Sequence, residues 1–181
     1  MTGRVVVIGV GNEFRRDDGA GPRAAALLTG CLPVGTALRL SDGDPVRMLT
    51  LWKPDDVVVV IESVHAHPSC PGRLHRLSAD RAALTARTGT SSHGLGPGEV
   101  VRLAEVLGLL PRRLVIHAVE GVDFAWGTEP SPQVAAALPA LAGRVLEEVH
   151  RAWRGRHACA EVAERRAART ANAATSGKGA A

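Results

Sequence analysis

Five consecutive β-branched residues, Val57–Ile61, form the segment that most constrains the fold of this chain. A strand without alternating polar residues is buried on both faces, as in the centre of a parallel sheet. The run Arg4–Ile8 has the same character, and candidate helices such as Pro97–Leu107 and Pro132–Val149 stand between or after the strand-like runs. This alternation predicts an α/β protein, a three-layer α/β/α sandwich with a mostly parallel twisted sheet.

A single folded domain is expected over residues 1–153. The 181 residues are 45% hydrophobic, which is enough for one good core. From residue 154 onward, Ala, Arg, Gly, Ser and Thr dominate and bulky apolar residues nearly vanish. Such a composition buries too little apolar surface to offset the entropy of ordering, so residues 154–181 are predicted to be a disordered Ala/Arg/Gly-rich tail.

The net charge of +4 is unevenly distributed and argues against nucleic acid as a partner. Residues 151–181 hold 7 Lys and Arg against 2 Asp and Glu, which leaves 15 against 16 in residues 1–150. A folded body near neutrality, with only 3% aromatic residues, lacks the basic patch and the stacking platforms of a nucleic-acid binder. The three cysteines are widely spaced, and no signal peptide or apolar stretch of 18 residues is visible. We therefore expect a cytoplasmic protein without membrane contact.

Three short segments place potential metal ligands at the ends of hydrophobic runs or in loops. Asp17 and Asp18 follow the first strand and its Gly-Val-Gly-Asn loop, Glu62 directly follows the Val-rich run, and His93 lies in a Ser-Ser-His-Gly segment. Ligands of parallel α/β sheets bind beyond the carboxyl ends of the strands, where these segments would meet. Two carboxylates and one imidazole can hold a divalent ion with open coordination positions.

Each of these residues also has a purely structural interpretation. One of the two adjacent aspartates can cap the following helix. Glu62 can form a salt bridge with one of the many arginines, since a carboxylate at the end of a buried strand needs a partner. His93 can be an ordinary surface histidine, and His65 and His67 are rival ligands close to Glu62.

Taken together, the segments resemble the hydrogenase maturation endopeptidases. The family pattern of Gly-x-Gly-Asn, Asp-(Asp/Glu)-Gly-x-Gly, a Val-rich strand closed by an acid, and Ser-His-Gly is found at Gly9–Asn12, Asp17–Gly21, Val57–Ser63 and Ser92–Gly94. The resemblance spans about residues 4–150. It implies a phosphorylase/hydrolase-like fold and an enzyme that removes the C-terminal extension of the nickel–iron hydrogenase large subunit after nickel insertion.

The resemblance also assigns roles to residues. The family's metal ligands map onto Asp18, Glu62 and His93, which are therefore the predicted metal-binding and catalytic residues. The resemblance implies that the metal is nickel carried by the substrate, and that the partner is the precursor of the large subunit. We expect the protein to be a monomer. The family usually has Asp-Ala where this chain has Glu62-Ser63, so the carboxylate lies one methylene further out.

Two alternative functions stay open at this point. A peptidyl-tRNA hydrolase-like esterase also opens with a strand and a Gly-x-Gly-Asn loop, although its catalytic histidine is missing from Arg16–Gly19. A metal-sensing hydrogenase chaperone would bind the unprocessed subunit without cutting it. The chain has no HExxH helix and no Gly-x-Ser-x-Gly elbow, which argues against ordinary zinc and serine hydrolysis. Asp18 and Glu62 are both candidates for the general base.

Overall fold

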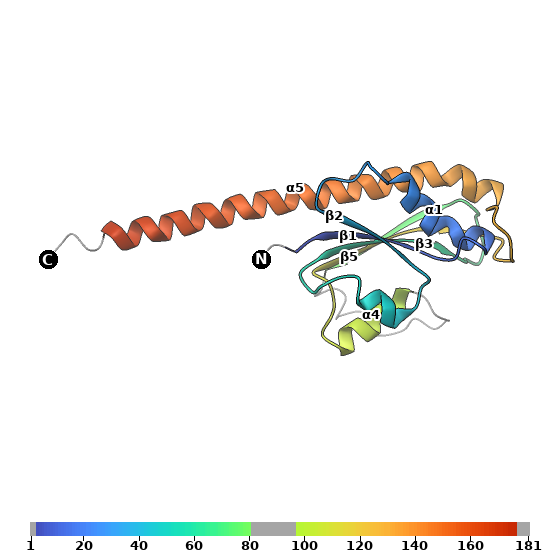
Figure 1. The fold of residues 1–181 in the computed structure, drawn as a ribbon, viewed down its shortest axis with the longest axis horizontal. Helices are drawn as coiled ribbons and strands as arrows, with labels where there is room; N and C mark the ends of the chain where they lie inside the picture. The colour runs from blue at the N-terminus through green and yellow to red at the C-terminus, as the bar shows by residue number, and fades with distance from the viewer. Residues whose placement is uncertain (1–2, 81–96, 177–181) are drawn as a thin grey trace.

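The computed structural model of the protein describes residues 3–80 and 97–176 (Figure 1). Within this part of the chain, one five-stranded sheet has the order β2-β1-β3-β5-β4. Its strands are β1 (Val5–Val10), β2 (Thr36–Ser41), β3 (Val57–Val64), β4 (Leu74–Asp80) and β5 (Arg113–Glu120). The pairs β1–β2, β1–β3 and β3–β5 are parallel, and the edge strand β4 is antiparallel to β5. The prediction of a mostly parallel sheet is confirmed.

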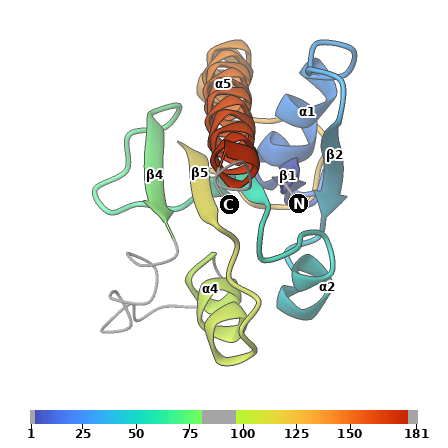
Figure 2. The same cartoon turned by 90° about the vertical axis from the view of Figure 1, so that its left-hand side faces the viewer.

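Helices cover both faces of the sheet, as the three-layer prediction requires. The helices are a 3-10 turn η1 (Arg16–Gly19), α1 (Ala20–Leu27), α2 (Pro45–Leu49), α4 (Pro97–Val106) and α5 (Pro132–Ser176). Figure 2 shows α1 and α5 on one side of the sheet and α2 and α4 on the other. The protein therefore has two apolar cores, one on each face of the sheet.

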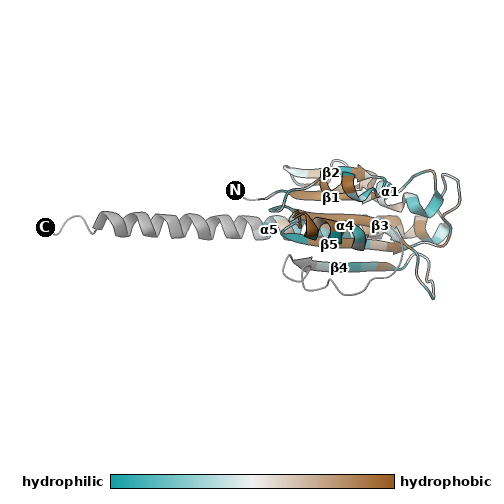
Figure 3. Cartoon of the chain, turned by 90° about the horizontal axis from the view of Figure 1, so that it is seen from below, coloured by the Kyte–Doolittle hydropathy of each residue, from teal (hydrophilic) through white to brown (hydrophobic). Residues whose placement is uncertain are grey.

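The central strands β1 and β3 are as hydrophobic as burial on both faces of the sheet requires. Every residue of β1 is buried, and the run Val57–Ile61 of β3 is buried throughout. Figure 3 shows these strands as the brown, hydrophobic centre of the molecule. Alternate residues of a strand point to opposite faces, so β3 contributes to both cores: Val59 and Ile61 belong to one, and Val58 and Val60 to the other.

Strand β3 is longer than the sequence predicted, and this places Glu62 inside the sheet rather than after it. The hydrophobic run ends at Ile61, but pairing with β5 continues through Val64. Backbone hydrogen bonds to a neighbour of equal length extend the strand, whatever side chains it carries. Burial alternates in the added part, with Ser63 buried and Glu62 partly exposed.

Helix α5 differs from the expectation of a disordered tail after residue 153. It runs without interruption to Ser176 and projects far from the sheet in Figure 1. The segment is rich in Ala, Arg and Glu, which are strong helix formers, so local propensity favours the helix even where it projects. The boundary of the folded domain at residue 153 stays a prediction.

Truncation of the chain after Arg154 should leave the melting temperature of the domain nearly unchanged. Among the side chains that the structure describes, Ala152 and Trp153 are the last along the chain that pack on the core, and the cut keeps both. Thermal unfolding of the full and shortened chains measures the effect. A loss of several kcal/mol in unfolding free energy would show that the distal part of α5 stabilises the domain.

No helix among the described residues is both long and apolar enough to cross a membrane.

Candidate active site

The candidate site lies at the carboxyl ends of β1 and β3, the two neighbouring strands between which the order of the strands along the chain reverses. Strands β1 and β3 are neighbours; the chain continues from β1 to β2 on one side and from β3 to β4 and β5 on the other, so the two connections leave in opposite directions. This is the topological switch point at which open α/β sheets bind their ligands. Asp18 lies in η1 directly after the β1 loop, and Glu62 lies in β3.

Gly21 brings these two segments together. A Cβ at this position would lie 2.6 Å from the carbonyl oxygen of Ile61 and would also clash with that of Val10. The first turn of α1 therefore rests directly on the backbone at the ends of β1 and β3. Because Asp18 precedes this turn and Glu62 follows Ile61, the close approach sets their positions relative to each other.

Gly21→Ala should therefore destabilise the fold by about 3 kcal/mol, the upper range for inserting a methyl group into a tightly packed interior. The new methyl would meet backbone atoms, which cannot rotate away. Gly143→Ala is the matched control, because an added Cβ there meets nothing within 4 Å and alanine favours the α5 helix. Urea unfolding should show a loss for the first variant and a small gain for the second; equal effects would contradict this account.

Asp18 and Glu62 form an acidic pair. The backbone N–H of Asn12 donates to Oδ2 of Asp18 over 3.0 Å, which fixes the carboxylate next to the β1 loop. Burial raises the pKa of Glu62 to about 7, and the negative charge of Asp18 contributes to this rise. No ion pair joins Glu62 to an arginine among the described residues, so the structure gives no support to the salt-bridge interpretation.

The third predicted ligand, His93, lies outside the described residues. Within 3–80 and 97–176, no three His, Cys, Asp or Glu residues form a group that could hold a metal ion. The rival His65 packs instead against the rings of His67 and Phe124, with centroid distances of 4.7 and 5.8 Å. The structure thus brings Asp18 and Glu62 together, and the role of His93 stays a prediction.

Asp17 has a structural role that the sequence did not reveal. It is fully buried and does not cap a helix. Its Oδ2 accepts from the N–H groups of Val122 and Asp123, both at 2.9 Å, and from the hydroxyl of Ser131; its Oδ1 accepts from the N–H of Ser131 at 2.6 Å. Burial alone would raise the pKa of Asp17, but these hydrogen bonds outweigh it and lower the pKa.

Asp17 thereby fastens the loop 121–131 to the segment that carries Asp18. Arg16 makes two further contacts with this loop. Its backbone N–H donates to Gly127 O at 2.9 Å, and its guanidinium forms an ion pair with Asp123 at 2.7 Å. Arg16 adopts a positive φ of 44°, which a non-glycine residue keeps only where its surroundings hold it. The partners of Asp17 are mainly backbone groups more than 100 residues away, so no local sequence pattern could have indicated them.

Comparisons with known proteins agree with this architecture. A family model described as hydrogenase maturation protease matches residues 44–148. The hydrogenase expression/formation protein HupD of Bradyrhizobium diazoefficiens is 28% identical over 153 residues, covering 80% of this chain and 79% of the relative. HupD of Rhodobacter capsulatus is 25% identical over 154 residues, covering 83% and 72%.

Solved structures show the same fold. The hydrogenase maturating endopeptidase HybD from E. coli superposes with a TM-score of 0.68 at 22% identity, covering 82% of this chain and 93% of that one. A hydrogenase 2 maturation peptidase from a Thaumarchaeota archaeon gives 0.60 at 27% identity, covering 81% and 97%. The matched family region includes Glu62 and more than half of the chain, and it favours this assignment over a peptidyl-tRNA hydrolase. The chain belongs to the hydrogenase maturation protease family.

Proposed function

We propose that this protein is an endopeptidase that removes the C-terminal extension from the precursor of a nickel–iron hydrogenase large subunit after nickel insertion. The observation that carries the proposal is the pairing of Asp18 and Glu62 at the switch point of a sheet that has the fold of this protease family. The proposal extends the family assignment to a substrate and to the two side chains that meet it.

The metal in this proposal is nickel already held by the substrate. Asp18 and Glu62 offer carboxylate oxygens, and His93 would add one imidazole nitrogen, a mixed donor set that suits a borderline divalent ion. One oxygen of Asp18 accepts from Asn12, and the described residues give the other oxygen no hydrogen bond. That second oxygen is therefore available to a group on the incoming substrate.

Peptide hydrolysis at this site needs a proton acceptor beside the scissile carbonyl. Water adds to the carbonyl carbon as one of the two carboxylates takes its proton, and the same proton then moves to the leaving amine nitrogen as the C–N bond breaks. Asp18 and Glu62 come from different elements, so one can accept the proton while the other contacts the metal-bearing part of the substrate. Substrate-held nickel would position the precursor and polarise its groups.

The decisive experiment incubates the purified protein with nickel-loaded and nickel-free precursor subunit and measures the released C-terminal peptide by mass spectrometry. We expect cleavage of the loaded precursor by the wild type, and neither cleavage of the nickel-free form nor cleavage by Asp18→Asn. Binding of the loaded precursor without any cleavage would instead identify a metal-sensing chaperone. Equal cleavage of both precursor forms would contradict nickel recognition.

We also propose that the protein acts as a monomer in the cytoplasm. Asp18 and Glu62 come from one chain, so a single copy supplies the acidic pair. Light scattering of the purified protein measures the mass in solution directly. An activity that appears only at dimer-forming concentrations would contradict the proposed monomer.

A further inference from the structure

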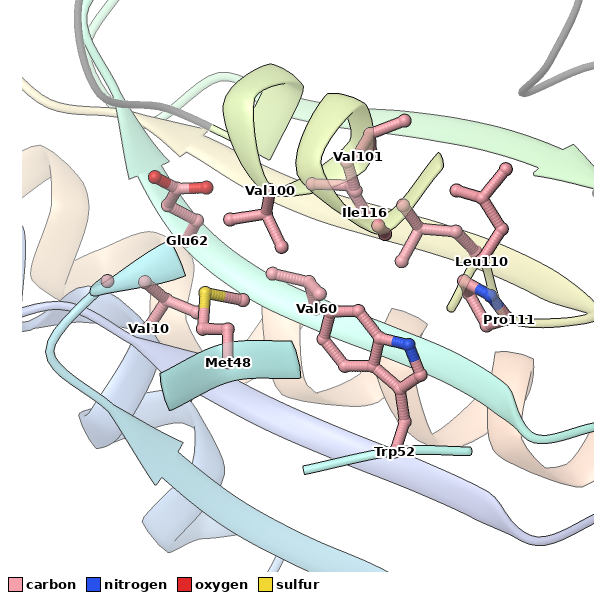
Figure 4. Close-up of a pocket in the computed structure, with 13 residues that line it drawn as sticks. Val10, Met48, Trp52, Val60, Glu62, Val100, Val101, Leu110, Pro111 and Ile116 are labelled. Atoms are coloured by element: carbon pink, nitrogen blue, oxygen red, sulfur yellow. The ribbon is translucent and has the colours of Figure 1, made fainter. Parts of the chain in front are cut away.

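A small apolar cavity lies beside Glu62, on the face of the sheet that α2 and α4 cover (Figure 4). Its volume is about 40 Å³. Figure 4 shows Glu62 at one end of the cavity, next to Val100 of α4, and Trp52 and Leu110 at the other end. The cavity therefore begins at one of the two proposed active-site carboxylates and extends into the apolar layer between the sheet and the helices.

The lining of the cavity is unsuited to water. Apart from Glu62, it is formed by hydrophobic side chains and glycine. The one polar group of Trp52, its indole N–H, already donates to Leu109 O at 2.9 Å. Cavities without polar partners stay dry and take apolar ligands, and a space of this size holds a small aliphatic group.

The other hollow beside the site has a different character. It lies along the β1 loop and is lined in part by Asp42 and Arg47, whose side chains form an exposed ion pair at 3.0 Å. Its lining also includes apolar side chains such as Phe14 and Leu40, but the hollow is wide and open to solvent, and neither Asp18 nor Glu62 lines it. Only the cavity at Glu62 therefore combines an apolar lining with direct contact to the acidic pair among the described residues.

We propose that this cavity is a specificity subsite that binds the aliphatic side chain of a substrate residue directly flanking the scissile peptide bond. The proposal rests on the proposed function, because it requires a peptide whose scissile bond lies at Asp18 and Glu62. Consecutive Cα atoms of a peptide are about 3.8 Å apart, so only a residue next to the reacting carbonyl can reach a cavity that begins at Glu62.

Two residues of α4 set the size of the subsite. Ala104 and Val100 both line it and are almost fully buried. Ala104→Val adds two methyl groups to the wall, and Val100→Ala removes two. Val106→Ala is the control. It makes the same change as Val100→Ala in the same helix, but at a position that is 83% exposed.

The test pairs these enzyme variants with substrate variants. Nickel-loaded precursors carry Ala, Leu, Phe or Asp in turn at each of the two positions that flank the scissile bond. Both kcat/KM for cleavage and Kd for binding are measured, and thermal unfolding confirms that each enzyme variant is folded. The substrate series by itself tests the subsite in the wild type, even if an enzyme variant fails to fold.

At one of the two positions, the wild type should prefer Leu over Asp by about 100-fold or more, because a charged side chain finds no partner in the cavity. Ala104→Val should shift the preference toward Ala, and Val100→Ala toward Leu or Phe, each by about tenfold. Val106→Ala should leave the preference unchanged. A structural effect alone would lower all kcat/KM values equally and leave their ratios unaltered.

The outcomes separate the two proposals. Cleavage with the same side-chain preference in every enzyme variant, or with no preference at either position, would overturn the subsite and leave the proposed function standing. A wild type that binds without cutting would still show the subsite through Kd. A wild type that neither cuts nor binds any precursor would overturn the proposed function and the subsite with it.

Discussion

Glu62→Gln should abolish precursor cleavage and, at the same time, make the metal-free protein more stable above neutral pH. We expect activity to fall by at least about 100-fold, the usual contribution of a positioned acid–base group. The stability gain has a separate cause. Burial first, and then the charge of Asp18, raise the pKa of Glu62 from 4.5 to about 7, so the ionised carboxylate is unfavourable in the folded protein.

The sign of the pH dependence follows from this shift. Between pH 4.5 and about 7 the folded protein binds the extra proton, so stability falls as pH rises through this range and then levels off. The penalty approaches about 3 kcal/mol above pH 7 and is below about 1 kcal/mol at pH 5. Glutamine keeps the shape without the charge, so Glu62→Gln should raise the Tm by about 5–10 °C at pH 8 and much less at pH 5.

Glu62→Asp is the matched control for activity, because it keeps the carboxylate and restores the acid usual in the family. It should retain cleavage, whereas a folded and fully active Glu62→Gln protein would remove Glu62 from the site. A fall in Tm at pH 8 for Glu62→Gln would show that the charged form is stabilised by a partner. The Tm measurements are made with a chelator present, since a bound cation would favour the ionised carboxylate of Glu62.

Asp17→Ala should destabilise the fold by about 3 kcal/mol or more, the largest loss expected from any single side chain near the site. Four partly buried donors from Val122, Asp123 and Ser131 would lose their shared acceptor, and a donor left unpaired away from water costs about 1–3 kcal/mol. Precursor cleavage should fall as well, because the loop 121–131 would no longer be fixed to the segment that carries Asp18. Urea unfolding and the cleavage assay measure the two effects.

The pH dependence distinguishes this role from simple packing. The pKa of Asp17 lies below its usual 3.8, so its stabilising effect is present above that pH and is lost as the pH falls through the lowered pKa. The difference between wild type and Asp17→Asn should therefore be largest at neutral pH and should shrink as the pH falls below 3.8. Asp18→Asn, one residue away, should abolish cleavage with little loss of stability; equal destabilisation by both changes would contradict the division of roles.

The different roles of these two adjacent aspartates arise from their surroundings. Asp17 is fully buried and holds a loop, whereas Asp18 is partly exposed and lies next to Glu62. A rigid attachment of the neighbouring residue helps the site, because groups that hold a metal or move a proton must stay close to their working geometry. The buried aspartate thus supports the functional one through the backbone that they share.

The sequence by itself determined the architecture and two of the candidate site residues. Uninterrupted β-branched runs such as Val57–Ile61 can only be central strands, because no face of such a strand suits water. Once the sheet is parallel, chain direction alone carries the segments after β1 and at the end of β3 to one edge. For this reason Asp18 and Glu62 could be predicted to meet.

Tertiary structure decided what depends on partners distant in the chain. The extension of β3 past Ile61 follows from its pairing with β5, and the role of Asp17 follows from backbone donors at residues 122–131. The apolar cavity needs α2, α4 and the sheet together, and no single one of these segments encodes it. Local patterns report what a segment prefers, but hydrogen bonds and packing between distant segments exist only after the chain has folded.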